Sequence, residues 1–126
     1  LYESFAKSGM LSLDGRCKTF DAKANGYVRG EGIGAIILKP LHRALKEGDV
    51  LYGVIKGVAI NHGGRVTTLT APNPKAQADL IQSAWQANAI TPDTISYIEA
   101  HGTGTSLGDP IEVNGLKRAF SLEASK

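Results

Sequence analysis

The chain has 126 residues, enough for one ordinary domain, and a formal net charge of +2 at pH 7. Its basic residues are scattered and only 6% of the residues are aromatic, so the composition does not favour a nucleic-acid-binding protein. No apolar run approaches the ~18 residues that a membrane-spanning helix needs. The single cysteine excludes an internal disulfide and is consistent with a reducing compartment.

The first half of the chain predicts strands separated by turns and one short helix. Residues 1–13 are expected to form the end of a helix and a loop. Pro40 is predicted to start a helix over residues 41–47, which Gly48 ends. Strands are predicted at 27–29, 33–38 and 51–60, and the apolar run over residues 36–38 is typical of a sheet covered on both faces.

The second half predicts a longer helix after an extended segment at residues 67–70. Asn73 is a favourable N-cap, and Pro74 suits the first position of a helix over roughly residues 75–88. The apolar side chains of this helix recur with a 3.6-residue period. That period places Trp85 in the core rather than in a binding site.

A glycine-rich turn joins a predicted strand at residues 95–98 to a last helix. Asp109 is a favourable N-cap for that helix, Pro110 suits its first position, and Glu112 is spaced as in a capping box. His101 therefore stands at the carboxyl end of a strand and at the head of the turn. In open α/β sheets, ligands bind in the crevice at this place.

The turn combines residues that are useful for chemistry. Gly102 and Gly104 allow positive φ or a close approach to a ligand, and Thr103 and Thr105 each offer a hydroxyl that donates and accepts. The imidazole of His101 can donate a hydrogen bond or carry a proton near neutral pH. A purely structural histidine would fit the same spacing. A phosphate-binding loop is disfavoured because no lysine follows in the required place.

Several stretches of the chain together resemble one family. Residues 99–113 read Glu-Ala-His-Gly-Thr-Gly-Thr-Ser-Leu-Gly-Asp-Pro-Ile-Glu-Val. Residues 14–21 read Asp-Gly-Arg-Cys-Lys-Thr-Phe-Asp, residues 26–32 read Gly-Tyr-Val-Arg-Gly-Glu-Gly, and residues 70–73 read Thr-Ala-Pro-Asn. In this order, they resemble the β-ketoacyl synthase (ketosynthase) domains of modular type I polyketide synthases. Residues 99–113 resemble the region around the family's first active-site histidine.

The order of the predicted elements indicates an α/β fold with at least one βαβ-like crossover. The resemblance implies a partial thiolase-like fold, which in the complete domain is a layered α-β-α-β-α duplication that usually dimerises. Residues 1–126 would then be an internal piece of one ketosynthase domain, spanning the end of its first half and the start of its second. Apolar faces would need the rest of the domain to cover them, and residues 121–126 are expected to form an exposed tail.

The resemblance also implies the chemistry of decarboxylative Claisen condensation between acyl and malonyl-type thioesters. His101 would donate to the thioester oxygen, together with a second histidine outside this chain, and Thr103 and Thr105 would bind the amides of a phosphopantetheine arm. An acyl carrier protein would be the partner that carries this arm, so no cofactor or metal is expected on the chain itself. A cytoplasmic location and no condensation by the chain alone are expected.

Other reactive side chains are interpreted as structural. Cys17 lies in a turn-to-extended stretch rather than at a helix N-terminus, with only Arg16 and Lys18 beside it in sequence. The family's nucleophile lies in a serine-rich motif that this chain does not contain. His42 is expected on the solvated surface and His62 in a loop, and the histidines do not have metal-ligand spacing. Arg29 and Glu31 are expected at a hairpin surface or as a structural pair.

Two alternatives to a condensing polyketide ketosynthase stay open. Some synthase-like domains hold acyl groups or play a structural role without condensing, and loss of the motif's histidine is one way in which they arise. The presence of His101 favours the condensing enzyme. A ketosynthase of a fatty acid synthase shares the chemistry, but the stretch Asp-Pro-Ile-Glu at residues 109–112 resembles the polyketide type more.

Overall fold

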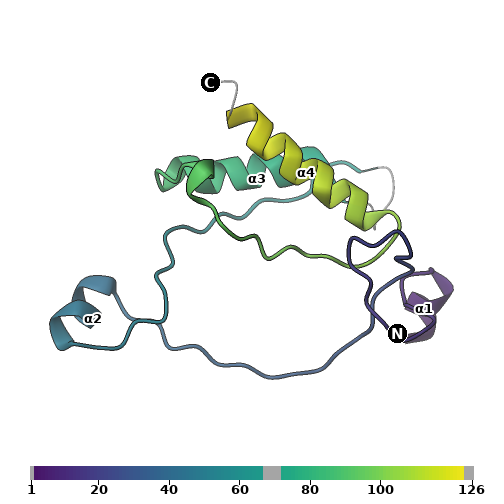
Figure 1. Cartoon of the computed structure of the whole chain (residues 1–126), viewed down its shortest axis with the longest axis horizontal. Helices are drawn as coiled ribbons and strands as arrows, with labels where there is room; N and C mark the ends of the chain where they lie inside the picture. The colour runs from purple at the N-terminus through teal and green to yellow at the C-terminus, as the bar shows by residue number, and fades with distance from the viewer. Residues whose placement is uncertain (1, 67–71, 124–126) are drawn as a thin grey trace.

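A computed structural model of the chain describes residues 2–66 and 72–123. Figure 1 shows α3 and α4 lying side by side, with α1 and α2 at opposite ends of a wide loop of extended chain. No helix in the described ranges is long and apolar enough to cross a membrane. The elements, in chain order, are α1 (Tyr2–Lys7), α2 (Leu41–Glu47), α3 (Pro74–Ala87), the 3₁₀ turn η1 (Pro92–Thr94) and α4 (Gly108–Glu123).

The predicted strands are extended, but they are not paired into a sheet. Among residues 2–66 and 72–123, the only β-bridge joins Leu11 to Tyr27 in parallel. The side chains of Ile33, Ile37 and Tyr52 are 105%, 99% and 102% exposed. A strand forms its hydrogen bonds with a neighbouring strand, and the described residues place none beside these segments. The prediction of formed strands at 27–29, 33–38, 51–60 and 95–98 is therefore wrong for this chain by itself.

The predicted helices with strong local signals are confirmed. Gly48 adopts φ 72° at the end of α2, in the left-handed region that glycine favours. The side chain of Asn73 caps α3 by accepting hydrogen bonds from the N–H groups of Lys75 and Ala76. The extended segment predicted at residues 67–70 lies outside the described residues.

The core lies between α3 and α4. Ala78 and Ala119 are fully buried, and Trp85 is 7% exposed, as its position in the apolar period predicts. The rings of Trp85 and Phe120 meet edge to face, with centroids 4.9 Å apart. Gln82 Nε2 donates to the carbonyl oxygen of Ala119 at 3.1 Å, which adds a polar tie between the two helices.

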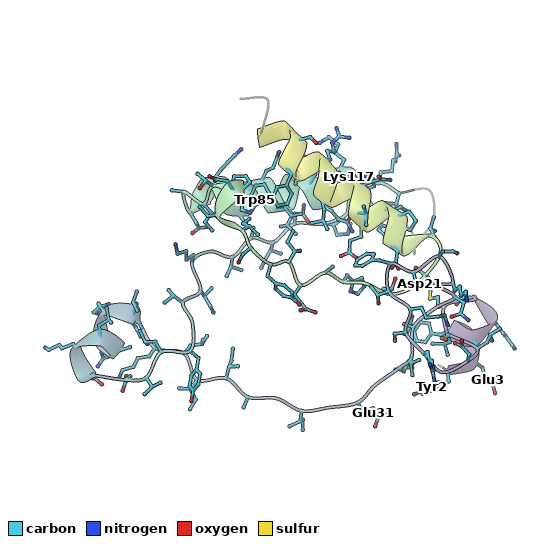
Figure 2. All side chains as sticks on the ribbon, in the orientation of Figure 1. Tyr2, Glu3, Asp21, Glu31, Trp85 and Lys117 are labelled. Carbon is cyan, nitrogen blue, oxygen red and sulfur yellow. The ribbon has the colours of Figure 1, made fainter. Side chains whose placement is uncertain are left out.

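The side chain of Arg29 packs against α1. Its guanidinium carbon lies 4.5 Å from the ring centroid of Tyr2 and 5.4 Å from that of Phe5. Figure 2 shows Tyr2 on α1 and Glu31 farther along the extended segment. The predicted pair of Arg29 and Glu31 is thus not formed, because the guanidinium lies over the two aromatic rings of α1 instead.

Helix α4 continues to Glu123, into the stretch that was predicted to be an exposed tail. Ser121 is exposed, as expected, but it is helical. Residues 124–126 lie outside the described residues.

Because Trp85 fills the interface between α3 and α4, Trp85→Ala should lower the free energy of unfolding of the complete domain by about 3–5 kcal/mol. Denaturant unfolding monitored by circular dichroism measures this loss. Lys117 is exposed on α4 (Figure 2), and Lys117→Ala should change the same quantity by less than about 0.5 kcal/mol. Equal, small effects for both variants would show that the core lies elsewhere.

Candidate active site

The turn that carries His101 is held onto α4 by the carboxylate of Glu112. Glu112 Oε1 accepts the backbone N–H of His101 at 2.6 Å, and Oε2 accepts that of Gly102 at 2.8 Å. Gly102 adopts φ 53°, and its carbonyl oxygen accepts the hydroxyl of Thr19 at 2.7 Å. The backbone on both sides of the imidazole is therefore fixed by one side chain from the first turns of the helix.

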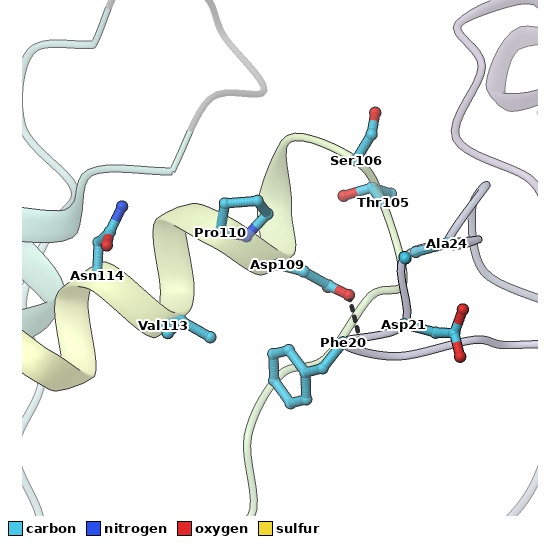
Figure 3. Close-up of a pocket in the computed structure, with 10 residues that line it drawn as sticks. Phe20, Asp21, Ala24, Thr105, Ser106, Asp109, Pro110, Val113 and Asn114 are labelled. Carbon is cyan, nitrogen blue, oxygen red and sulfur yellow. Dashed lines mark hydrogen bonds between the residues drawn. The ribbon is translucent and has the colours of Figure 1, made fainter.

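A second carboxylate, that of Asp109, fixes the next part of the same turn. Asp109 is 5% exposed, and its Oδ1 accepts the N–H of Gly104 at 2.9 Å. Its Oδ2 accepts the N–H of Phe20 at 2.7 Å, the contact drawn as a dashed line in Figure 3. The carbonyl oxygen of Gly104 in turn accepts the N–H of Gly26 at 2.8 Å. Asp109 thus joins the turn to the upstream segment of Phe20, and the backbone of Gly104 joins it to Gly26.

These contacts correct the predicted capping arrangement. Helix α4 begins at Gly108, so Asp109 lies in its first turn and is not the N-cap. Thr105 occupies the capping role instead, since its hydroxyl accepts the N–H of Gly108 at 2.9 Å and its carbonyl oxygen that of Asp109 at 3.2 Å. Glu112 does not complete a capping box, because its carboxylate is engaged by the turn.

The structure brings the predicted site residues into one pocket. His101, Thr103 and Thr105 line a cavity of about 460 Å³, together with Met10 and Gln77 from distant parts of the chain. His101 is exposed, and its imidazole has no hydrogen-bond partner among the described residues. The ring is therefore available to a ligand.

The two threonine hydroxyls also have capacity for a ligand. Thr103 Oγ1 and Thr105 Oγ1 lie 3.0 Å apart and share one hydrogen bond, while Thr105 accepts from Gly108. Two hydroxyls carry two protons and one of these is used between them. The other proton has no acceptor in the described part of the chain, so the pair can donate one hydrogen bond into the pocket.

A second pocket of about 590 Å³ lies beside the first and shares Thr105 and Ser106 with it. Phe20, Asp21 and Asp109 line it (Figure 3). His101 does not line this second pocket. We therefore take the His101 pocket as the candidate active site.

The residues that were interpreted as structural lie outside the His101 pocket. Cys17 is exposed, and its sulfur accepts the N–H of Val28 at 3.2 Å, which ties two segments of loop together. His62 Nδ1 accepts the N–H of Gly64 at 3.0 Å within its own loop, and His42 is exposed on α2. Among the residues described, no three His, Cys, Asp or Glu side chains are placed to hold a metal ion.

The groups with perturbed acidity also lie away from the pocket. Hydrogen bonds from Lys18 and Ser12 hold the pKa of Asp14 well below its usual range. Hydrogen bonds to Asp49 and Glu47 raise the pKa of Lys39. A hydrogen bond to Glu99 raises the pKa of Tyr97. These shifts reflect local pairing at exposed positions.

Sequence reasoning missed Gln77 and Met10 as lining residues, because each comes from an element distant in sequence from the turn. It also missed that Asp109 and Glu112 hold the turn rather than cap the helix. The acidic residues following the turn were the available signal, but the same residues are typical of a helix start.

Comparison with known families identifies the class of protein. Residues 1–44 match the family model "Beta-ketoacyl synthase, N-terminal domain", and residues 52–126 match "Beta-ketoacyl synthase, C-terminal domain". The second match covers more than half of the chain. The chain therefore belongs to the beta-ketoacyl synthase family.

The relatives are polyketide synthases. The chain is 62% identical to the polyketide synthase PksN of Bacillus subtilis (strain 168) over 120 residues, which cover 95% of this chain and 2% of that protein. It is 51% identical to the polyketide synthase ThaG of Burkholderia thailandensis over 122 residues, which cover 97% of this chain and 2% of that protein. The chain is thus a small part of the length of these relatives.

Solved structures give the same result. The ketosynthase from module 6 of the bacillaene synthase of Bacillus subtilis 168 matches with a TM-score of 0.93 at 47% identity, over 99% of this chain and 23% of that one. An oxazolomycin ketosynthase domain from Streptomyces albus matches with a TM-score of 0.92 at 47% identity, over 97% of this chain and 21% of that one. The predicted thiolase-like fold class is confirmed, and the extended segments follow the path of the matching region of complete ketosynthases.

Glu112→Gln should loosen the turn, because an amide offers one acceptor oxygen where the carboxylate offers two. We expect the free energy of unfolding of the complete domain to fall by about 1–3 kcal/mol. Amide hydrogen exchange should also accelerate at His101 and Gly102. Glu31→Gln, at an exposed position, is the control and should leave both readouts unchanged. Unchanged exchange at the turn in Glu112→Gln would show that the carboxylate does not fix it.

Proposed function

We propose that this chain forms one wall of the thioester site of a ketosynthase that catalyses decarboxylative Claisen condensation in polyketide biosynthesis. The observation that carries the proposal is the shared pocket of His101, Thr103 and Thr105, whose imidazole and one hydroxyl proton have no hydrogen-bond partner among the described residues. Family membership supports this reading, because the relatives are polyketide synthases.

The reaction has two half-reactions. An acyl group first moves from the thiol of a carrier arm to a cysteine thiol supplied by another part of the domain. A malonyl-type thioester on a second carrier then loses carbon dioxide, and the electron pair left by the C–C cleavage forms an enolate. The enolate carbon attacks the acyl-cysteine carbonyl, the new C–C bond forms, and the cysteine leaves as thiolate.

His101 acts where negative charge develops. Decarboxylation places charge on the thioester oxygen of the extender, and a hydrogen-bond donor positioned at that oxygen stabilises the transition state. The imidazole of His101 is such a donor, acting together with a second histidine outside this chain. The carboxylate of Glu112 accepts the backbone N–H of His101 and so holds the backbone in place, without a hydrogen bond to the imidazole.

Thr103 and Thr105 bind the arm that delivers the thioester. A pantetheine arm carries secondary amides whose carbonyl oxygens need donors, and the threonine pair has one hydroxyl proton to give. The phosphopantetheine belongs to an acyl carrier protein, which is the partner we propose. The chain itself holds no cofactor or metal in this mechanism.

The chain is the central part of the domain. The match to the N-terminal family model ends at residue 44 and the match to the C-terminal model begins at residue 52, which supports a position across the junction of the two halves. The rest of the domain would cover the exposed apolar segments at 33–38 and 50–60. A homodimer in the cytoplasm is the proposed setting, and the 126-residue chain alone is expected to be inactive.

Two alternatives lead to different results. A non-condensing, acyl-holding domain would bind the thioester in the same pocket without forming a C–C bond. A fatty acid synthase ketosynthase would carry out the same chemistry in fatty acid biosynthesis instead of polyketide biosynthesis. The presence of His101 in the pocket favours condensation, and the similarity to polyketide synthases favours the polyketide type.

In the complete domain, His101→Ala should lower the rate of condensation by about 10²–10³, because one donor to the developing oxyanion is lost. Acylation of the cysteine should persist, since the role of His101 begins afterwards. Intact-protein mass spectrometry measures the acyl-enzyme, and product mass spectrometry measures condensation, on the same preparation.

His62→Ala is the matched control, because His62 does not line the pocket and its side chain accepts the N–H of Gly64 within its own loop, and it should condense at the wild-type rate. Near-normal condensation by His101→Ala would rule out the catalytic role. Parallel loss of acylation, condensation and melting temperature would make His101 a structural residue.

Cys17→Ser should leave acyl loading largely intact, because a serine hydroxyl can accept the N–H of Val28 as the sulfur does. The acyl adduct measured by intact mass should equal that of the wild-type domain. Loss of the adduct from a folded Cys17→Ser domain would overturn the structural assignment of Cys17.

A further inference from the structure

The side chain of Gln77, near the start of α3, has no role in the function proposed above. Its backbone N–H donates to the carbonyl oxygen of Asn73 at 3.0 Å, as in any first turn. Its side-chain Oε1, however, is buried and has no hydrogen-bond partner among the described residues. Buried polar groups are nearly always paired, so an unpaired amide oxygen at this position requires a reason.

Gly115 on α4 makes room for this amide. A Cβ atom at Gly115 would lie 2.7 Å from Gln77 Oε1, closer than real contacts allow, and 3.1 Å from Gln77 Cβ, which is a tight contact. The two helices run side by side here (Figure 1). The side chain of Gln77 is therefore held between the helices, with its oxygen against α4.

The same side chain lines the His101 pocket. Gln77 shares that cavity with His101, Thr103 and Thr105. Only its Oε1 is buried without a partner, and Nε2 makes no hydrogen bond within residues 2–66 and 72–123. Because the oxygen lies beside Gly115 and Gln77 lines the pocket, the NH₂ group is the part of this amide that remains available to a ligand.

We propose that Gln77 is a further substrate-binding residue, whose Nε2 donates to an amide carbonyl of the pantetheine arm. This inference rests on the proposed function. A neutral NH₂ donor suits a neutral carbonyl acceptor, and the arm's amides are the groups of that class in the substrate. His101 binds the thioester carbonyl. Gln77 on α3 and the threonine pair in the turn before α4 then bind the amides of the arm.

The test compares thioesters with and without amides. The complete domain is acylated with acetyl-pantetheine and, separately, with S-ethyl thioacetate, which carries the same acyl group and no amide. Gln77→Leu should lower kcat/KM for acetyl-pantetheine about tenfold, the size of one hydrogen bond, mainly through KM. The value for S-ethyl thioacetate should change less than about twofold, because no hydrogen bond is lost there.

Gln86→Leu is the control, since Gln86 is exposed on the same helix and does not line the pocket, and both thioesters should react as with wild type. Should Gln77→Leu fail to fold, Gln77→Glu keeps the size of the side chain, lacks the NH₂ donor, and should show the same selective loss. No loss, or an equal loss with both thioesters, would overturn the role of Gln77 and leave the proposed function intact. Failure of the wild-type domain to accept either thioester would overturn the proposed function and this inference with it.

Discussion

The structure of the site depends on two carboxylates that α4 presents to the turn before it. Glu112 accepts the N–H groups of His101 and Gly102, and Asp109 accepts those of Gly104 and Phe20. Hydrogen bonds to a charged acceptor are stronger than those between neutral groups, and negative charge is favourable in the first turns of a helix. The helix therefore determines the shape of the turn, and the glycines make that shape accessible.

In this arrangement, the carboxylates of α4 hold the backbone of the turn, and the side chains of the turn are left to bind a ligand. Because the carboxylates satisfy the backbone, the imidazole of His101 and one threonine hydroxyl proton need no partner within the described chain. Their hydrogen-bonding capacity faces the pocket instead. Gln77 on α3 lines the same pocket, and its amide oxygen lies close to Gly115 of α4.

The features that could be predicted from the sequence are those that depend on residues close together in the chain. The helix over residues 41–47, the cap at Asn73 and the burial of Trp85 rest on neighbours within a few positions, and the structure confirms them. The strands were predicted from apolar runs, but pairing needs a neighbouring strand that the described residues do not provide. Asp109 was misassigned because one residue type serves both as a helix cap and as an anchor for a remote amide. The packing of Arg29 on α1 has no local signature.

The central claim is that the His101 pocket receives the arm of a carrier-bound thioester. A crystal structure of the complete domain with a non-hydrolysable acyl-pantetheine analogue tests it most directly. The account predicts the thioester carbonyl oxygen within about 3.2 Å of the His101 imidazole and an amide of the arm at the same distance from the threonine pair. An analogue bound in the pocket of Phe20 and Asp21, or one that leaves His101 without contact, would contradict the account.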